Sequence, residues 1–343
     1  MRFSLADFTR AIRSATPRAM RGSVLGIDIG TSSIKVVQLG LRENQPVLET
    51  YGEIGLAKYG AQTLANYAQL QPEIEGSALA DLIHEINATA REGGIALSQA
   101  ATLTTLAELP KRDEEQMKKI IGVEAQRFIP VPMDTVKLDW ITIPDESAEV
   151  RAFDQLADKK GIQARTQKVL LVASENIAAN ARMKAVHIAD IVPSFGEVEM
   201  FSITRACKSN VSEPSLIIDM GATTTKLYIA DERGMPIAAH VLQTGGNETT
   251  RAIAAALGWE TTHAEEAKRA YSSAEGANLA KKERDVIAKL LAQFTADVFT
   301  VARGMIDTHA EHRARRITHI IVSGGGAEIC IPEVREHIHK KFA

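Results

Sequence analysis

One motif occurs twice in the chain, and this repeat constrains the fold more than any other feature. The first copy is VLGIDIGTSSIKVVQL, residues 24–39, and the second is SLIIDMGATTTKLYIA, residues 215–230. Each copy has an apolar run, then Asp, an apolar residue and Gly, then small residues with hydroxyl groups, then Lys and more apolar residues. The apolar runs predict buried strands, and the glycine allows a sharp turn between them. The chain is therefore expected to have two similar halves, each with a β-hairpin.

The polar residues at the turn of each copy suit a phosphate ligand. Backbone amides and hydroxyl groups at such a turn are donors for phosphate oxygens. A carboxylate at the end of the first strand suits a hydrated Mg²⁺ that bridges phosphates, so Asp28 and Asp219 are expected to bind Mg²⁺ through water. The expected phosphate-binding residues are Gly30, Thr31, Ser32, Ser33, Gly221, Ala222, Thr223 and Thr224. Two facing hairpins would hold a polyphosphate in a cleft between the halves.

Other interpretations of the repeat are open. Lys35 either offsets phosphate charge or is an exposed strand lysine, because alternation turns only one side of a hairpin toward a ligand. Either copy alone could be an ordinary hairpin, but the repetition in both halves favours a phosphate site. A dinucleotide site of the Rossmann type is disfavoured, because no GxGxxG follows either strand.

A third glycine-rich element lies near the end of the chain, in ITHIIVSGGGAEI, residues 317–329. An apolar strand leads to Gly324, Gly325 and Gly326, and Ala327 is expected to begin a helix. Three glycines let the backbone lie flat against a base or ribose, since no side chain intervenes. A linker would also contain such a run, but the preceding strand favours a binding loop.

Composition excludes several classes of protein. The net charge is −3 and the pI is near 6.3, so there is no general basic footprint for nucleic acid. Cys207 and Cys330 are the two cysteines, too few for a disulfide framework or a CxxC zinc site. The N-terminal residues 1–21 are basic and have apolar residues at helical spacing. They predict either a helix packed on the protein, a tail, or a helix on a membrane surface.

Together, the three motifs resemble the two phosphate motifs and the adenosine motif of the actin-like ATPase superfamily. Residues 109–143, which contain EAQRFIPVP, are similar to a segment of the PilM family of type IV pilus assembly proteins. Residues 196–206 (GEVEMFSITRA), 244–258 (TGGNETTRAIAAALG) and 264–269 (AEEAKR) are similar to other PilM segments. The resemblance covers most of the chain from about residue 22, although the polar segment 145–165 looks longer than the linker usual in the family.

The resemblance implies an α/β fold of the actin-like type, a duplicated ribonuclease H-like ATPase with the inserted subdomain of FtsA and PilM. The expected parts are a basic N-terminal segment (1–21), a first half (22–98 and 167–210), an inserted α/β subdomain (99–166) and a second half (211–343) with a helical lid at about 247–301. Within the insertion, the residue patterns predict strands at 100–109 and 135–143 and a helix at 113–128.

The resemblance also implies further contacts with a nucleotide. Gly245, Gly246 and Asn247 match the family's GGxxxT segment. Glu265 and Lys268 lie three residues apart on the AEEAKR helix, so both can face the ribose or adenine. A surface ion pair is the alternative interpretation of these two residues.

The family's acidic position falls on Glu199, which becomes the candidate for orienting an attacking water. Glu197 is two residues away and is expected on the same face of a strand. ATP and Mg²⁺ are the expected ligands, and hydrolysis is expected to be slow or negligible. The nucleotide would then set the angle between the halves.

The resemblance implies a cytoplasmic scaffold that is peripheral at the inner membrane through its partners. PilM proteins bind the cytoplasmic N-terminal tail of the membrane protein PilN in a groove beside the inserted subdomain, which here lies near residues 131–139. Other proteins of the pilus assembly platform and further copies of the chain are additional candidate partners, whereas nucleic acid is not expected.

Two alternatives share the fold. One is a filament-forming membrane tether like FtsA, which requires a C-terminal amphipathic helix; residues 333–343 have the spacing but are short. The other is a small-molecule kinase, for which the sequence shows neither a cysteine-rich zinc motif nor a convincing catalytic aspartate in a sugar-binding loop.

Overall fold

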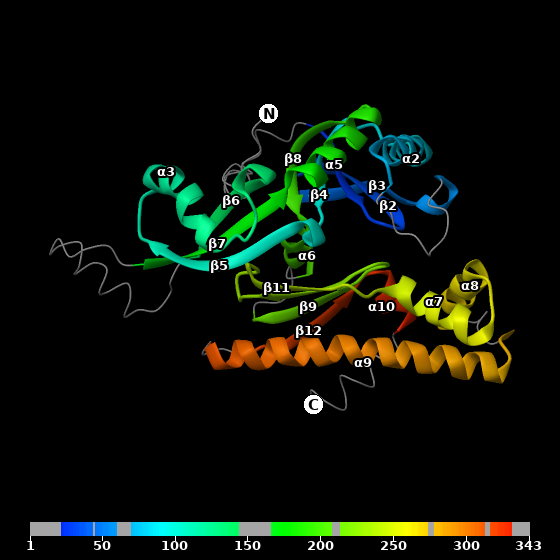
Figure 1. Cartoon of the computed structure of the whole chain (residues 1–343). Coiled ribbons are helices and arrows are strands. Elements are labelled where there is room, and N and C mark those ends of the chain that lie inside the picture. Colours follow the sequence, from blue (N-terminus) through cyan, green and yellow to red (C-terminus); the bar gives the residue numbers. More distant parts are fainter. Residues whose placement is uncertain are drawn as a thin grey trace.

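Three β-sheets organise the protein (Figure 1). The computed structural model describes residues 22–43, 45–59, 70–143, 166–207, 213–273, 278–312 and 316–330. The predictions for residues 1–21, 145–165 and 333–343 concern segments outside these residues. Within the described ranges, no helix is both long enough and apolar enough to cross a membrane.

The first sheet contains the first copy of the repeat. Its five strands have the order β3-β2-β1-β4-β8. They are β1 (Val24–Ile29), β2 (Ser33–Arg42), β3 (Gln45–Gly55), β4 (Glu92–Leu97) and β8 (Val192–Val198), with a 3₁₀ turn η1 (Leu56–Tyr59) after β3. Helices α2 (Pro72–Glu85) and α5 (Asn176–Ile188) pack on one face, where alternate residues of β1 are buried. Because side chains alternate along a strand, Asp28 faces the opposite side and is exposed.

The second sheet contains the second copy and repeats the same arrangement. Its order is β11-β10-β9-β12. The strands are β9 (Ser215–Met220), β10 (Thr225–Ala230), β11 (Pro236–Leu242) and β12 (His319–Ser323). In both sheets the repeat forms an antiparallel hairpin, and a parallel strand pairs with the first strand of that hairpin. This is the duplication that the sequence predicts.

Helices surround the second sheet. They are α6 (Glu199–Cys207), α7 (Gly246–Leu257), α8 (Thr261–Ala270), α9 (Lys281–His312) and α10 (Gly325–Ile329). The long α9 runs along the sheet (Figure 1). Its Phe299 is fully buried in the same core as Tyr228 of β10. Helix α6 begins where β8 of the first sheet ends and packs on β10 and β11 of the second. It therefore connects the two halves.

The third sheet forms the inserted unit. Its order is β5-β7-β6, with β5 (Thr102–Pro110), β6 (Val136–Ile143) and β7 (Thr166–Glu175). Helix α3 (Glu114–Glu124) covers it and is capped by Asp113, which accepts a hydrogen bond from the amide of Gln116 at 2.7 Å. Short 3₁₀ turns lie at Gln99–Ala101, Ala125–Arg127 and Met133–Thr135.

The structure corrects one boundary of the sequence analysis. Residues 167–210 are predicted to belong to the first half, but β7 pairs along most of its length with both β5 and β6. Its central residues, such as Val169 and Leu171, are buried in the core of the inserted unit. Strand pairing therefore places residues 166–175 in the insertion, and the first half resumes at α5.

Candidate functional site

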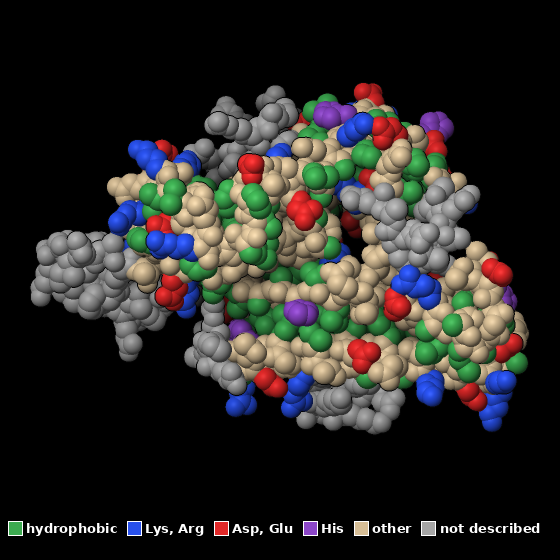
Figure 2. Space-filling view, viewed as in Figure 1, with side chains coloured by type: hydrophobic (Ala, Val, Ile, Leu, Met, Phe, Trp, Pro, Cys, Tyr) green, Lys and Arg blue, Asp and Glu red, His purple; other side chains and the backbone are tan. Residues whose placement is uncertain are grey.

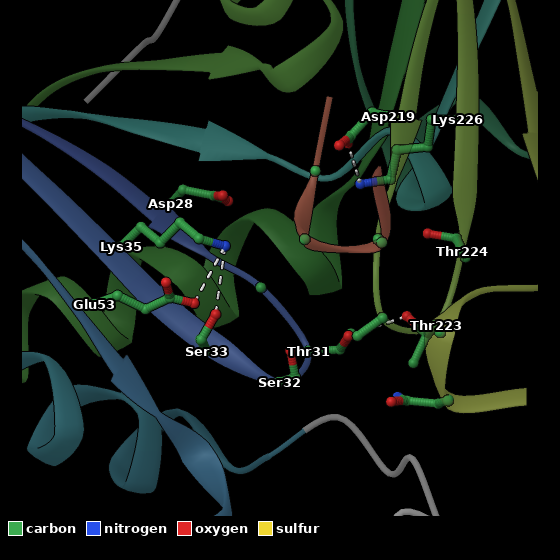
Figure 3. A pocket seen from close by; sticks show the side chains of 18 of the residues that line it. Asp28, Thr31, Ser32, Ser33, Lys35, Glu53, Asp219, Thr223, Thr224 and Lys226 are labelled. Atoms are coloured by element: carbon green, nitrogen blue, oxygen red, sulfur yellow. Dashed lines mark hydrogen bonds and ion pairs between the residues drawn. The ribbon is translucent and has the colours of Figure 1, made fainter. Parts of the chain in front are cut away.

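A cavity of about 740 Å³ lies between the hairpins of the two halves (Figure 3). We call it the hairpin cavity. The predicted site residues that line it are Asp28, Gly30, Thr31, Ser32, Ser33, Lys35, Glu199, Asp219, Gly221, Ala222, Thr223, Thr224, Gly246, Asn247, Glu265, Lys268, Gly324, Gly325 and Gly326. Residues from both copies of the repeat and from the triple-glycine loop therefore meet in one place, although they lie far apart in the sequence.

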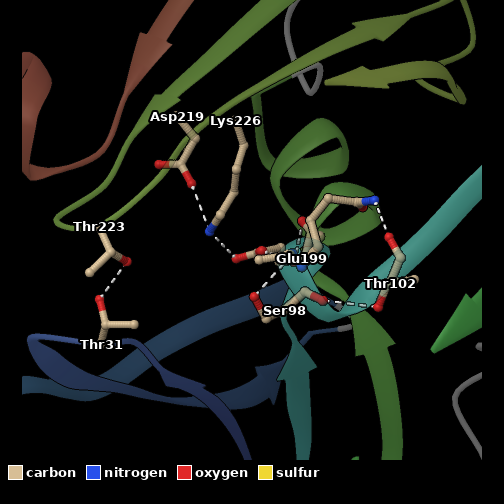
Figure 4. A network of polar contacts seen from close by, with 10 residues as sticks. Thr31, Ser98, Thr102, Glu199, Asp219, Thr223 and Lys226 are labelled. Carbon is tan, nitrogen blue, oxygen red and sulfur yellow. Dashed lines mark hydrogen bonds and ion pairs between the residues drawn. The ribbon is translucent and has the colours of Figure 1, made fainter. Parts of the chain in front are cut away.

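The two turns have the same construction. The amide of Gly30 donates to the carbonyl of Ser33 at 3.0 Å, and the amide of Gly221 donates to the carbonyl of Thr224 at 3.1 Å. The turns also touch, since the hydroxyl oxygens of Thr31 and Thr223 lie 3.0 Å apart (Figure 4). The tips of the hairpins thus form a direct contact between the halves.

The aspartates of the repeat stand at equivalent positions in different surroundings. Asp28 pairs across its hairpin with Lys35, and Asp219 pairs across the other with Lys226. Asp28 is exposed, whereas the Asp219 side chain is only 20% exposed. Burial raises the pKa of Asp219, and the charge of Asp28 adds to this effect. The carboxylates of the two hairpins therefore act on each other across the cavity.

The lysines opposite the two aspartates, Lys35 and Lys226, also differ in their exposure to solvent. The side chain of Lys35 is 54% exposed and lies 3.5 Å from Glu53. The side chain of Lys226 is 13% exposed, and its Nζ lies 2.7 Å from Oε2 of Glu199 and 3.7 Å from Oδ2 of Asp219 (Figure 4). Burial opposes the charge of Lys226, but the two carboxylates outweigh burial and raise its pKa. The second hairpin therefore carries a charged, largely shielded lysine at the cavity wall.

Glu199 is the first residue of α6, and its carboxylate reaches the cavity. Its Oε1 accepts a hydrogen bond from the amide of Gln99 at 2.5 Å, and its Oε2 accepts one from Lys226. Burial raises the pKa of Glu199, and the charge of Lys226 opposes this rise. The carboxyl group of Glu199 is thus largely shielded from solvent and is held by two hydrogen bonds.

Glu197 does not share this position, contrary to the expectation that the two glutamates lie on one face. Both of its carboxylate oxygens accept hydrogen bonds from the guanidinium of Arg205 at 2.7 Å. Glu197 belongs to β8, whereas the chain turns into α6 at Glu199, so strand alternation does not relate the two residues.

The triple-glycine loop packs against the second hairpin. Gly324 has φ of +87°, a conformation that other residues rarely adopt. A Cβ atom there would lie 2.5 Å from the carbonyl oxygen of Met220 and 2.7 Å from Oδ1 of Asp219. Helix α10 begins at Gly325, two residues earlier than predicted. Ala327 does not line the cavity, and its amide donates to the carbonyl of Gly324.

Helix α7 also docks on the second hairpin. The amides of Gly246 and Asn247 donate to the carbonyls of Gly221 and Ala222 at 3.0 and 2.8 Å. Gly245 does not line the cavity, because it lies behind the turn, where a Cβ atom would meet the oxygen of Ala222 at 2.6 Å. The side-chain nitrogen of Asn247 is buried and has no hydrogen-bond partner among the described residues. It is a donor without an acceptor.

Glu265 and Lys268 form a buried ion pair, so they are not the surface pair of the alternative interpretation. Their charged atoms lie 2.6 Å apart, and the Lys268 side chain is 4% exposed. Lys268 also donates to the hydroxyl of Thr250 at 2.7 Å and to the carbonyl of Gly246 at 2.8 Å. Burial lowers the pKa of Lys268. At Glu265 burial favours a higher pKa, but the charge of Lys268 and the hydrogen bonds from Lys268, Thr250 and Arg269 outweigh burial and lower the pKa.

Four further residues line the hairpin cavity although the sequence motifs do not predict them as site residues: Lys226, Ser98, Arg182 and Arg269. Lys226 occupies the same position in the second copy of the repeat as Lys35 in the first, so the sequence could have predicted that Lys226 lies at the site. Arg182 and Ser98 reach the cavity only through the packing of α5 and of the segment after β4. Nothing in their local sequence marks them.

The comparisons with known proteins agree with this architecture. The family model described as Type IV pilus assembly protein PilM matches residues 26–342. A chain of a solved PilM-PilN type IV pilus biogenesis complex is similar with a TM-score of 0.70 and 23% identity, covering 92% of this chain and 87% of that chain.

Two other solved structures share the fold at lower similarity. The ethanolamine utilization protein EutJ from Carboxydothermus hydrogenoformans has a TM-score of 0.51 and 12% identity, covering 91% of this chain and 82% of that one. A diol dehydratase-reactivating factor in nucleotide-free form has a TM-score of 0.52 and 11% identity, covering 92% of this chain and 94% of that one. These similarities confirm the predicted actin-like α/β fold. Because the family model matches nearly the whole chain, the protein belongs to the PilM family of type IV pilus assembly proteins.

Proposed function

We propose that the hairpin cavity binds ATP with Mg²⁺, and that the ATP-bound chain is a scaffold which binds the N-terminal tail of a PilN-like inner-membrane protein. The observation that carries the first part is the convergence of both repeat copies on one cavity, with their tips 3.0 Å apart. Opposed turns that carry hydroxyl groups and backbone amides are an arrangement that can hold a polyphosphate.

The residues present fit such a ligand. Asn247 offers a buried donor that lacks an acceptor in the described part of the chain. Gly324 brings its backbone within contact of the second hairpin, in a conformation that a side chain would prevent. Asp28 and Asp219 would hold Mg²⁺ through water, and Thr31, Ser32, Ser33, Thr223 and Thr224 would donate to phosphate oxygens. The metal would supply positive charge to the phosphates.

The cationic side chains divide between two parts of the cavity. Lys35 and Lys226 belong to the hairpins, where the phosphates would lie, and Lys268 stands beside α7, where we expect the ribose or adenine. Lys268 and Glu265 are already engaged with each other, so we assign them to nucleoside recognition rather than to phosphate binding.

Thermal unfolding tests nucleotide binding. ATP and Mg²⁺ at about 100 times their dissociation constant are expected to add about 2.7 kcal/mol to the free energy of unfolding. Asp219→Asn is expected to remove the Mg²⁺-dependent part of this protection. The control is Asp297→Asn, at an exposed position of α9, which should leave the protection unchanged. Wild-type protein that ATP and Mg²⁺ do not stabilise would contradict the proposal.

The second part of the proposal concerns the inserted unit. Its sheet order leaves β6 at an edge among the described strands, and Phe128 and Val131 nearby in the sequence are 36% and 42% exposed. An open strand edge with apolar neighbours suits an extended peptide. The similarity to a PilM-PilN complex supports a PilN-like tail as that peptide, which would place the scaffold on the cytoplasmic side of the inner membrane.

Peptide titration tests this surface. A peptide with the sequence of the N-terminal tail of the PilN-like partner is expected to bind the wild-type chain, and a scrambled peptide is not. Val131→Asp is expected to weaken binding at least about 10-fold, or about 1.4 kcal/mol. Ile177→Asp, at an 84% exposed position on α5, is the matched control and should bind like the wild type. Equal effects of the two substitutions would contradict the proposed surface.

A further inference from the structure

The ion pair of Lys226 and Glu199 spans the two halves of the protein. Glu199 begins α6 at the end of the first sheet, and Lys226 lies on β10 of the second. Their charged atoms are 2.7 Å apart, and the side chains are 17% and 13% exposed, respectively. Charge pairs that are shielded from water interact more strongly than pairs on the surface. The pair therefore fixes Glu199 at the wall of the hairpin cavity.

The contacts of Glu199 limit what its carboxylate can do. One oxygen accepts from the amide of Gln99 and the other from the ammonium group of Lys226 (Figure 4). These donors occupy one lone-pair site on each oxygen, so a water that Glu199 orients and deprotonates must bind at one of the remaining sites. The ammonium group neutralises the charge and lowers the proton affinity of Glu199, so it weakens the carboxylate as a base.

We propose that Lys226 restrains ATP hydrolysis by holding Glu199 in this ion pair, so that the cavity keeps bound ATP intact. The inference rests on the proposed ATP site and adds a residue that regulates its chemistry. Lys226 acts through Glu199 and is a positioning residue. The equivalent lysine of the first hairpin, Lys35, contacts Glu53 at the surface and has no such role.

The restrained reaction is ordinary hydrolysis. Water attacks the γ-phosphorus, and a new P–O bond forms. The bond between the γ-phosphorus and the bridging oxygen breaks, and ADP leaves with that electron pair. The proton lost by the water passes to Glu199 and then to the phosphate product or solvent. ADP and inorganic phosphate are the products.

The test uses the full chain and measures ATP binding and single-turnover hydrolysis separately. Lys226→Gln removes the charge but keeps a hydrogen-bond donor, and Lys226→Met is a second neutral variant in case one of them folds poorly. Both are expected to bind ATP within about 3-fold of the wild type, or about 0.7 kcal/mol. Hydrolysis is expected to rise about 10-fold or more, since a positioned base contributes about 10²–10⁴-fold. Protection against thermal unfolding should then decay from its ATP value to its ADP value during incubation.

Three control variants distinguish the proposal from a general loosening of the cavity. Lys226→Arg keeps the charge and should hydrolyse ATP as slowly as the wild type. Lys118→Met neutralises a lysine of α3 that pairs with Glu114 and does not line the hairpin cavity, so it should also leave hydrolysis unchanged. The double variant Lys226→Gln with Glu199→Gln should lose the rise, because the freed carboxylate is then absent.

Each contrary result has a definite meaning. ATP that binds normally but is hydrolysed no faster by the neutral variants would overturn the restraint. A rise that persists in the double variant would also overturn it, since Glu199 would not be the base. Loss of ATP binding in the neutral variants would make Lys226 a phosphate ligand and overturn the restraint, while the proposed ATP site would stand. Failure of the wild type to bind ATP would refute the site itself.

Discussion

At the scale of single residues, Gly324 gives the sharpest prediction. Its φ of +87° and the closeness of Met220 and Asp219 leave no room for a side chain. Gly324→Ala is expected to cost about 1–3 kcal/mol of the free energy of unfolding, because an alanine in this conformation is strained and must displace its neighbours. It should also weaken ATP binding, since the loop lines the hairpin cavity. Urea unfolding and ATP titration measure the two effects.

The adjacent glycine provides the control. A Cβ atom at Gly325 would meet nothing within 4 Å, and its φ is not in the restricted region. Gly325 is also the first residue of α10, where alanine is a better helix former than glycine. Gly325→Ala should therefore leave stability unchanged or raise it slightly. A similar loss of stability at both positions would contradict the strain argument.

The residues also show how far a sequence can predict this site. The repeat and the triple glycine predict that the hairpin residues meet, because similar motifs in duplicated halves are expected to face each other across a cleft. The repeat gives Lys35 and Lys226 the same status, yet one is half-exposed beside Glu53 and the other is buried beside Glu199. Their difference depends on which element covers each hairpin. The covering helix α6 comes from a distant part of the chain, so local sequence does not reveal it.

At the scale of elements, α2 and α5 are joined by two ion pairs of the same type. Glu75 and Arg182 lie 2.5 Å apart with side chains 3% and 9% exposed, while Glu73 and Lys184 have side chains 55% and 58% exposed. Glu75→Gln leaves a buried guanidinium without its counter-charge and is expected to cost about 3–5 kcal/mol of stability. Glu73→Gln should cost less than about 1 kcal/mol, because exposed pairs contribute little.

Denaturant unfolding of the two variants measures this difference. Both substitutions keep the shape of the side chain and lie on the same helix, so burial is the main variable between them. Equal losses of stability would show that burial of the pair does not decide its contribution. Because Arg182 lines the hairpin cavity, ATP titration of the same variants shows whether the ion pairs between α2 and α5 affect the affinity for ATP.

The sequence predicts which residues form helices and strands better than it predicts which strands pair with each other. The strands at 100–109 and 135–143 and the helix at 113–128 correspond to β5, β6 and α3 with its following 3₁₀ turn. The residue patterns that predict these elements are local signals, so they identify the elements without knowledge of the fold. Strand β7 shows the limit, because its run of buried residues gives the strand but not the sheet it joins. Which edge a buried strand pairs with depends on the whole fold.

At the scale of the whole molecule, the halves meet at the hairpin tips and through α6. If the nucleotide sets the angle between the halves, a covalent link between the tips should fix that angle. The hydroxyl oxygens of Thr31 and Thr223 are 3.0 Å apart, so cysteines at these positions need only a small shift to form a disulfide. The double variant Thr31→Cys with Thr223→Cys is therefore expected to cross-link on oxidation and to separate again on reduction.

The cross-link tests whether nucleotide and tail peptide are coupled. Coupling between two sites is reciprocal and typically amounts to about 1–3 kcal/mol, or about 5–150-fold in affinity. The double variant lacks two hydroxyl groups that would donate to the phosphates, so ATP is used at a saturating concentration. In the reduced double variant, saturating ATP should change the affinity for the PilN-like tail peptide as it does in the wild type. In the oxidised variant that change should shrink toward zero, because the halves no longer move. The single cysteine variants, oxidised in the same way, control for Cys207 and Cys330. If the tail affinity of the oxidised protein still responds fully to ATP, then a change in the angle between the halves is not what couples nucleotide binding to tail binding.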